Sequence, residues 1–225
     1  MTTTTMIMMW AANADARLMC YMKGVLNGTI HQRCAVVYSS GSVLDERRGP
    51  EIDAHDAIIR FNDAPTRGFG EYVGVRTTYR FANYACSRQL AFPTKGPCAQ
   101  IWNVAGAEIF LTAARRLPAK STKRCDRLRT TDHFGLEGYA AFANASCGDQ
   151  SHTPMTGLKA VLAALELCRR VDVFGASESL RYHYYDDTHI TPTHDPHCER
   201  RFLRRSSRLF FAANGTYVTT SRFQS

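Results

Sequence analysis

The sequence predicts an α/β domain, because short apolar strands alternate with segments that turn or coil back. Residues 35–37 form a first apolar strand that ends in a small-residue turn at 39–42, and residues 57–59 form a second strand. Residues 156–168 carry apolar side chains at helical spacing, and 171–174 then indicate another strand. No Gly/Ser-rich or Pro-rich linker divides the 225 residues, so a single domain is expected.

The charge balance favours anionic partners. The formal net charge is +8, which suits nucleic acid, a membrane surface or a charged sugar nucleotide. Two Arg-rich clusters, 115–129 and 200–208, carry much of the excess, and each is most simply a solvated helix face. Neither has an aromatic stacking pattern or the signature of a known module, so nucleic-acid binding is the least favoured class.

Eight cysteines without a C-x-x-C pair make disulfides plausible. Three N-glycosylation sequons agree with a luminal or extracellular chain; they begin at Asn27, Asn144 and Asn214. The apolar stretch Met6 to Trp10 is interrupted well before it could span a bilayer, so no membrane anchor is evident. We expect residues 1–30 to be a short N-terminal segment and 31–225 to be the folded domain.

The first strand, turn and second strand have the features of half a nucleotide site. The turn after the first strand contains Ser39, Ser40 and Gly41. Backbone N–H groups and hydroxyls exposed in such a turn can meet a phosphate or a ribose. Asn62 ends the second strand, and its amide can both donate to and accept from a polar ligand.

Thr156 and Gly157 lie where the amphipathic helix begins. The free N–H groups and the positive end of the dipole at such a helix start favour an anion, here a carboxylate or a phosphate. Spacing alone equally suits a helix that only covers a sheet, so both interpretations stay open here.

Histidines cluster in the last third of the chain, followed by a cysteine: His183, His189, His194, His197 and Cys198. Imidazole and thiolate are good zinc ligands. The spacings match none of the common zinc signatures, so a metal site is not the favoured explanation.

Four segments in the right order resemble the sialylmotifs of the eukaryotic sialyltransferase family, glycosyltransferase family 29. Residues 33–83 resemble the large motif, and 154–177 resemble the small motif. The sequence His-Tyr-Tyr-Asp at 183–186 resembles the third motif, and His194 with Glu199 satisfies the His-x-x-x-x-Glu pattern of the very small motif.

The chain departs from the family's motifs at several places. Met155 replaces a Ser of the small motif, and Arg169 with Arg170 alters its Cys-Asp step. Tyr38 and Ser39 also differ from the residues common in relatives, which changes the turn after the first strand.

The resemblance implies a GT-A-like variant of the α/β fold, with a Rossmann-like, largely parallel sheet flanked by helices and the site at the strand carboxyl ends. It implies an inverting transfer of sialic acid from CMP-sialic acid to a galactose or N-acetylgalactosamine hydroxyl of a glycan, with no metal or other cofactor. The sequence contains no Asp-x-Asp motif, in agreement with metal-independent chemistry.

The resemblance also implies residue roles. His194 is expected to be the general base, since a histidine titrates near neutral pH, and His183 is expected to donate to the phosphate of the leaving group. Glu199 and Tyr184 are expected to support them. The donor-binding set is expected to be Ser39, Ser40, Gly41, Asn62, Thr156 and Gly157.

Cys34 and Cys168 match a pair that forms a disulfide between the large and small motifs in the family. Closing so long a loop stabilises a fold by on the order of 4 kcal/mol in the loop-entropy account. The resemblance also implies a Golgi-lumen or other secretory-pathway location.

Alternatives remain at this stage. A transferase of another CMP-activated keto-sugar acid, such as Kdo, and a catalytically degenerate CMP-sugar-binding protein both fit the motifs. The linkage is open as well, because residues 183–186 lean toward the α2,3 branch and residues 61–66 toward the α2,6 branch.

Overall fold

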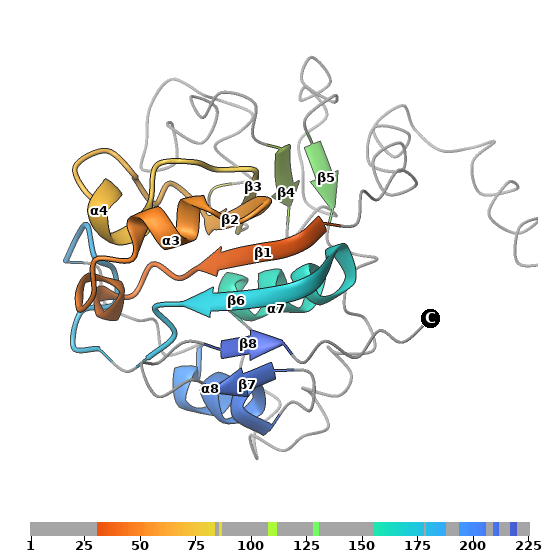
Figure 1. Ribbon diagram of the computed structural model, residues 1–225. Helices are drawn as coiled ribbons and strands as arrows, with labels where there is room; N and C mark the ends of the chain where they lie inside the picture. The colour runs from red at the N-terminus through yellow and green to blue at the C-terminus, as the bar shows by residue number, and fades with distance from the viewer. Residues whose placement is uncertain are drawn as a thin grey trace, which may run out of the picture.

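The computed structural model describes residues 31–83, 86, 108–111, 128–130, 155–177, 179–187, 194–205, 209–211 and 217–219. Their strands form one eight-stranded sheet in the order β5-β4-β3-β2-β1-β6-β8-β7 (Figure 1). The strands are β1 His31–Val37, β2 Ala57–Phe61, β3 Tyr79–Ala82, β4 Glu108–Leu111, β5 Leu128–Thr130, β6 Cys168–Phe174, β7 Leu209–Phe211 and β8 Tyr217–Thr219. The six from β5 to β6 are parallel, and β8 and β7 add an antiparallel edge. The predicted α/β class is confirmed.

Helices lie on both faces of the sheet. They are η1 Gly41–Leu44, α3 Gly49–Asp53, α4 Gly70–Val73, α7 Thr156–Leu167 and α8 Pro196–Arg205. One apolar core joins α7 and α8 to the sheet, and a second joins η1, α3 and α4 to the opposite face (Figure 1). The result is a three-layer arrangement, in agreement with the Rossmann-like expectation.

The central strands explain the apolar runs in the sequence. All five residues of β2 are buried, as are Cys34 to Val37 of β1. A strand covered by helices on both faces needs apolar side chains at consecutive positions rather than at alternate ones. The strand predicted at 35–37 begins earlier, at His31, because its polar first residues still pair in register with β6. Arg33, for example, lies opposite Arg170.

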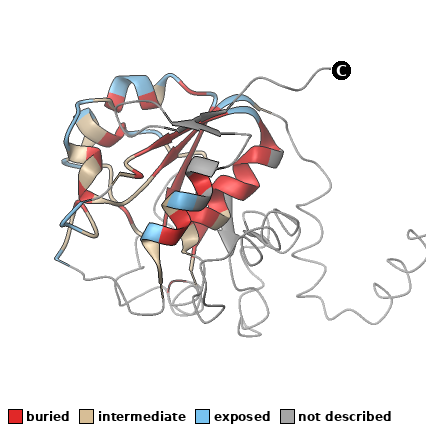
Figure 2. Ribbon diagram, turned by 90° about the horizontal axis from the view of Figure 1, so that it is seen from below, coloured by how far each residue is buried: buried red, intermediate tan, exposed pale blue. Residues whose placement is uncertain are grey.

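Helix α7 packs closely on the sheet because much of its surface is small. Ala160, Ala163 and Ala164 are fully buried, as are Leu158 and Val161. Figure 2 shows most of this helix in the colour of buried residues. The predicted helix therefore both covers the sheet and begins at its carboxyl edge.

A polar cluster, absent from the predicted features, links α3 to β6 on the other face. The Asp172 carboxylate lies 3.0 Å from His55 Nε2, 3.0 Å from Arg170 Nε and 3.2 Å from Arg33 Nη2. Burial opposes ionisation of Asp172, but the three hydrogen bonds outweigh it and lower the pKa of this carboxyl group. Both ring nitrogens of His55 are used, since Nδ1 lies 3.1 Å from the carbonyl oxygen of Ile52. The cluster fixes the end of α3 against the centre of the sheet.

Among the described residues, no helix is both long enough and apolar enough to cross a membrane. Residues 1–30, predicted to be a separate segment, and the sequons at Asn27, Asn144 and Asn214 lie outside the described residues.

Candidate active site

The carboxyl ends of β1 and β6 lie at one edge of the sheet, and the loops that follow them are joined by hydrogen bonds. Tyr38 N–H donates to the carbonyl of Phe174 at 2.9 Å. The Ser42 hydroxyl donates to the carbonyl of Gly175 at 3.1 Å. Figure 1 shows these two loops emerging together beyond the tips of the β1 and β6 arrows. Parts of the two segments that resemble the large and small motifs, within 33–83 and 155–177, thus form one surface.

Within the first turn, the predicted donor-binding residues do different things. Ser40 caps η1, because its side-chain oxygen accepts the N–H of Ser42 at 3.3 Å. Gly41 N–H donates to the carbonyl of Arg181 at 3.0 Å, and a Cβ on Gly41 would lie 2.7 Å from Arg181 Cβ. The Ser39 hydroxyl has no hydrogen-bond partner among the described residues. The turn therefore offers a hydroxyl at Ser39, while Gly41 allows the segment containing the third motif to approach.

Asn62 is fixed in an unusual backbone conformation at the end of β2. Its φ is +42°, the only positive value among the described non-glycine residues. Its N–H donates to the carbonyl of Phe81 at 2.8 Å, and its side-chain Oδ1 accepts the N–H of Asn83 at 2.9 Å. With the oxygen occupied, the NH₂ of the amide is the group that Asn62 can offer to a ligand.

Helix α7 starts beside the same edge. Met155 is the N-cap without a capping side chain, so Thr156 and Gly157 occupy the first turn. A Cβ on Gly157 would lie 2.6 Å from the ring of Tyr38. Glycine is needed there because Tyr38 packs against the helix start and edge-on against Phe61, with ring centroids 5.3 Å apart.

Glu199 of α8 reaches the start of α7. Its Oε1 accepts the backbone N–H of Met155, and the side chain is buried. Burial raises the pKa of Glu199 to about 7. The hydrogen bond from Met155 and the charge of Lys159 oppose that rise without cancelling it. The Glu199 carboxyl group thus links α8 to the N-cap residue of α7.

His194 lies two residues before the start of α8 and is half-buried. Asp195 begins the helix, since its Oδ1 accepts the N–H of Cys198 at 2.9 Å and its carbonyl accepts the N–H of Glu199 at 3.1 Å. Pro196 follows as the first helical residue, a position that proline favours. The backbone that carries His194 is therefore fixed by a complete N-cap.

The third motif lies across the large motif. Tyr184 N–H donates to the carbonyl of Ser39 at 2.8 Å, and the Tyr184 hydroxyl donates to the carbonyl of Pro65. The Tyr185 hydroxyl lies 3.5 Å from the carboxylate of Asp63, whose pKa is raised by burial. The contacts of Tyr184 attach the segment to both loops of the predicted nucleotide site.

His183 is enclosed by aromatic rings. Its ring stacks on Tyr182 and on Tyr185, with centroid separations of 4.5 Å and 4.8 Å. Its Nδ1 lies 2.9 Å from Asp186 Oδ1. A carboxylate only accepts, so Nδ1 carries a proton and Nε2 is the nitrogen left for a ligand.

The structure thus brings Ser39, Asn62 and the third motif together through Tyr184 and the 61–65 turn. Separately, it joins the small and very small motifs through Glu199 and Met155. A further link between the two groups is Tyr182, whose hydroxyl lies 3.9 Å from Met155 Sδ.

Sequence reasoning missed several residues that shape this site. Arg80 and Asp63 hold or line the 61–65 turn, and Asp186 orients His183. The signal for Arg80 was present: a charged residue stands between Tyr79 and Phe81 in a strand that is otherwise apolar. A buried charge of that kind requires partners.

Cys34 and Cys168 form a disulfide, as predicted, with a Cα–Cα distance of 6.0 Å. Cys86 and Cys198 are disulfide-bonded as well, so the Cys198 thiolate is not available for the zinc site considered above. Across the part of the chain that the structure describes, no three His, Cys, Asp or Glu side chains are grouped to hold a metal ion. The remaining cysteines and His189 lie outside the described residues.

A parallel sheet with polar and aromatic loops at its carboxyl edge is the arrangement of enzymes that bind nucleotides at a strand switch point. Residues 17–101 and 124–207 match the sequence profile of glycosyltransferase family 29 (sialyltransferase). The chain belongs to this family.

Individual relatives agree with the family assignment. The chain is 29% identical over 163 residues to CMP-N-acetylneuraminate-beta-galactosamide-alpha-2,3-sialyltransferase 1 of Mus musculus, covering 68% of this chain and 48% of that protein. It is 28% identical over 204 residues to Sialyltransferase-like protein 2 of Oryza sativa subsp. indica, and this match covers 76% of this chain and 51% of that protein. A shorter stretch of 75 residues is 48% identical to Beta-galactoside alpha-2,6-sialyltransferase 2 of Rattus norvegicus, covering 32% of this chain and 14% of that protein.

The fold is also that of a solved sialyltransferase. A crystal structure of a mammalian sialyltransferase superposes with a TM-score of 0.56 at 21% identity, covering 83% of this chain and 73% of that one. The chain spans about half the length of the mouse and rice relatives that it matches.

Proposed function

We propose that this chain transfers sialic acid from CMP-sialic acid to a galactose or N-acetylgalactosamine hydroxyl of a glycan, with inversion and without a metal. The observation that carries the proposal is the contact of the third motif with both loops of the large motif. Tyr184 bonds to the carbonyls of Ser39 and Pro65, so His183 lies beside the predicted donor-binding turn.

For donor binding, we propose that the Asn62 amide and the Ser39 hydroxyl meet the phosphate or ribose. Both have polar groups without partners among the described residues. Thr156 and Gly157 meet the sialic-acid carboxylate or the cytidine, because the first turn of α7 presents N–H groups without intrahelical partners. Ser40 and Gly41 act by holding the turn, since Ser40 caps η1 and Gly41 bonds to Arg181.

For the chemistry, we propose a single displacement. The His194 imidazole takes the proton of the acceptor hydroxyl, and the oxygen attacks the anomeric carbon of the sugar. The bond from that carbon to the phosphate oxygen breaks, and CMP leaves with the bonding electrons. His183 acts in this step as the imidazolium, because Nδ1–H already donates to Asp186; its Nε2–H donates to the phosphate and stabilises the developing charge. Glu199 and Tyr184 support these groups through the contacts described above.

The location proposed is the Golgi lumen or another compartment of the secretory pathway. The disulfide between Cys34 and Cys168 supports an oxidising compartment, and Cys86 and Cys198 each take part in a disulfide as well.

The direct test is incubation with CMP-sialic acid and a panel of galactosides and N-acetylgalactosaminides, followed by linkage analysis of the product. Sialylated product is expected, with CMP as a competitor, UDP as a poor one, and activity retained in EDTA. Loss of activity on chelation that manganese restores would contradict the metal-free mechanism. CMP binding without transfer to any acceptor would favour a degenerate CMP-sugar-binding protein.

The same assay distinguishes the two histidines. His194→Ala is expected to lower kcat for transfer by about 10²-fold or more, a typical general-base contribution, with little change in CMP affinity. His183→Ala is expected to slow both transfer and hydrolysis of CMP-sialic acid, because both reactions release the same phosphate. Transfer near the wild-type rate in correctly folded His194→Ala protein would overturn the assignment of the base.

A further inference from the structure

Arg80 carries a buried guanidinium group. Its side chain lies on β3 and is 3% exposed, and no ion pair to it occurs among the described residues. Burial lowers the pKa of Arg80. The hydrogen bonds of its Nη1 go to neutral acceptors, whereas its Nε has no hydrogen-bond partner among the described residues.

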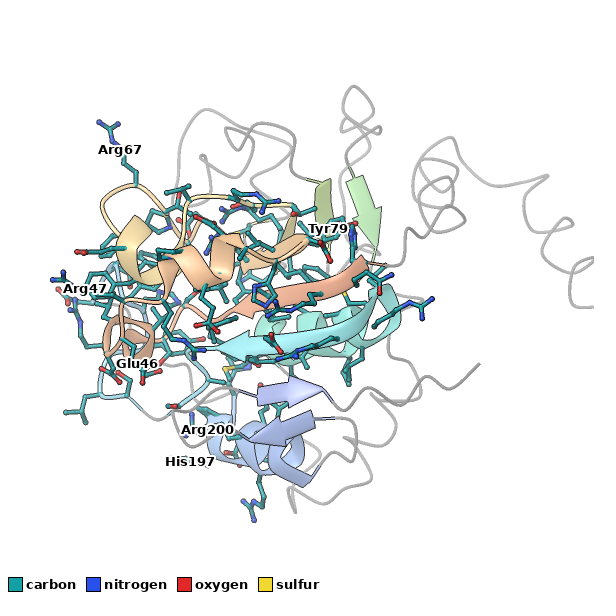
Figure 3. All side chains as sticks on the ribbon, viewed as in Figure 1. Glu46, Arg47, Arg67, Tyr79, His197 and Arg200 are labelled. Atoms are coloured by element: carbon teal, nitrogen blue, oxygen red, sulfur yellow. A yellow bond between two sulfur atoms is a disulfide. The ribbon has the colours of Figure 1, made fainter. Side chains whose placement is uncertain are left out.

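Those acceptors all belong to one turn. Arg80 Nη1 lies 2.8 Å from the carbonyl oxygen of Asn62, 3.2 Å from that of Ala64 and 3.4 Å from that of Phe61. One nitrogen thus draws three carbonyls of the segment after β2 toward a single point. Arg67, from the next stretch of chain, extends away from the molecule instead (Figure 3).

The carbonyls bound by Arg80 fix the backbone at Asn62. A φ of +42° is unfavourable for a side-chain-bearing residue and persists only where the surroundings impose it. Arg80 holds the Asn62 carbonyl, while Phe81 and Asn83 hold its N–H and its Oδ1. The direction of the remaining amide NH₂ therefore depends on Arg80.

The same turn carries the third motif, because Pro65 accepts the Tyr184 hydroxyl. We propose that Arg80 is a positioning residue of the donor site, which aims the Asn62 amide at the nucleotide by holding the 61–65 turn. This inference rests on the proposed function, in which Asn62 binds the donor.

The neighbouring strand offers a matched control. Arg60 lies opposite Arg80 in the β2–β3 register and is 1% exposed. Burial lowers its pKa to about 10. Its hydrogen bonds go to the carbonyl of Arg76 and the hydroxyl of Thr77, which precede β3 at the opposite edge of the sheet. Loss of Arg60 therefore removes a similar buried cation without touching the Asn62 turn.

The test compares Arg80→Met, Arg60→Met, Asn62→Ala and the double variant Arg80→Met/Asn62→Ala by titration calorimetry with CMP. We expect Arg80→Met and Asn62→Ala each to weaken CMP binding by about tenfold, and the double variant to be little weaker than either. Arg60→Met should bind CMP within about twofold of wild type. Additive losses in the double variant, or an equal loss in Arg60→Met, would overturn the proposal.

Hydrogen exchange supplies a readout that does not depend on CMP. The amide protons of Asn62 and Asn83 should exchange faster in Arg80→Met and at the wild-type rate in Arg60→Met. Unchanged exchange in Arg80→Met would refute the role of Arg80 whatever the affinity, whereas absence of CMP binding by wild type would refute the proposed function. If Arg80→Met does not fold, Arg80→Lys serves, since it keeps the charge but not the planar donor geometry.

Discussion

The orientation of His183 depends on one carboxylate. Asp186 accepts from Nδ1 at 2.9 Å, and the stacked rings of Tyr182 and Tyr185 prevent the imidazole from turning. The direction of Nε2 is then fixed by the hydrogen bond to Asp186 and by the two stacked rings. Asp186, the last residue of the segment 183–186, thus places a carboxylate in contact with the histidine.

At the scale of a residue, Asp186→Asn should lower kcat for both transfer and donor hydrolysis by about threefold to tenfold. A hydrogen bond to a charged acceptor is about twice as strong as one to a neutral amide, so His183 would lose part of its orientation. The measurement is kcat beside CMP affinity, which should change less.

Asp187→Asn is the control, because that neighbouring carboxylate is exposed and lies 4.0 Å from Arg181. Equal losses in the two variants would show that net charge of the loop, and not contact with His183, is responsible.

Between elements, Glu199 is the connection that joins α8 to the start of α7. Its carboxylate occupies the N-terminal end of a helix, where negative charge is favoured, yet its side chain is buried. The balance raises its pKa from 4.5 to about 7, with burial as the largest cause. We therefore expect the junction between α8 and α7 to be sensitive to pH.

The raised pKa of Glu199 predicts a pH-dependent stability. A carboxyl group whose pKa is higher in the folded state contributes stability below its unfolded value of 4.5, and that stability is lost as pH rises toward about 7. The loss is on the order of 3 kcal/mol in free energy of unfolding. In Glu199→Gln the side chain cannot ionise. Its free energy of unfolding should therefore change less with pH than that of wild type in denaturant titrations from about pH 5 to 7.5, a range that covers most of the interval between the two pKa values.

Glu71→Gln, at an exposed surface pair with Arg47, provides the comparison and should keep the wild-type slope. Parallel profiles for Glu199→Gln and wild type would contradict the assigned burial effect.

The sequence predicted the central elements and not the contacts between them. Strand β2 and helix α7 follow from apolar runs and helical spacing, because burial dictates side-chain type at each position. The positive φ of Asn62, the carbonyl contacts of Arg80 and the link from His55 to Asp172 depend on residues distant in sequence. No local pattern encodes such contacts, so only resemblance to a family could indicate part of them.

For the molecule as a whole, the disulfide between Cys34 and Cys168 joins the two central parallel strands. It closes a loop of 134 residues, and both sulfur atoms belong to the core that contains α7. The crosslink therefore reinforces the pairing of β1 with β6, which carries the two loops of the predicted donor site.

Removing this disulfide should reduce both stability and donor affinity. Cys34→Ser is expected to lower the free energy of unfolding by about 2–4 kcal/mol, and Cys168→Ser by a similar amount. The double variant should lose no more than either single one, because all three lack the same bond. Peptide mapping under non-reducing conditions should recover the two cysteines in one linked species, and free alkylation of both in native protein would contradict the structure.

The long sequence separation between Cys34 and Cys168 also affects how this disulfide can form during synthesis. At about 5–20 residues per second, the ribosome needs on the order of ten seconds to add the 134 residues from Ala35 to Cys168. Cys86 emerges during that interval, so Cys34 meets a wrong partner before its right one exists. We therefore expect correct assembly to require late oxidation or thiol–disulfide exchange, and the yield of native protein to depend on the redox buffer in which the chain matures.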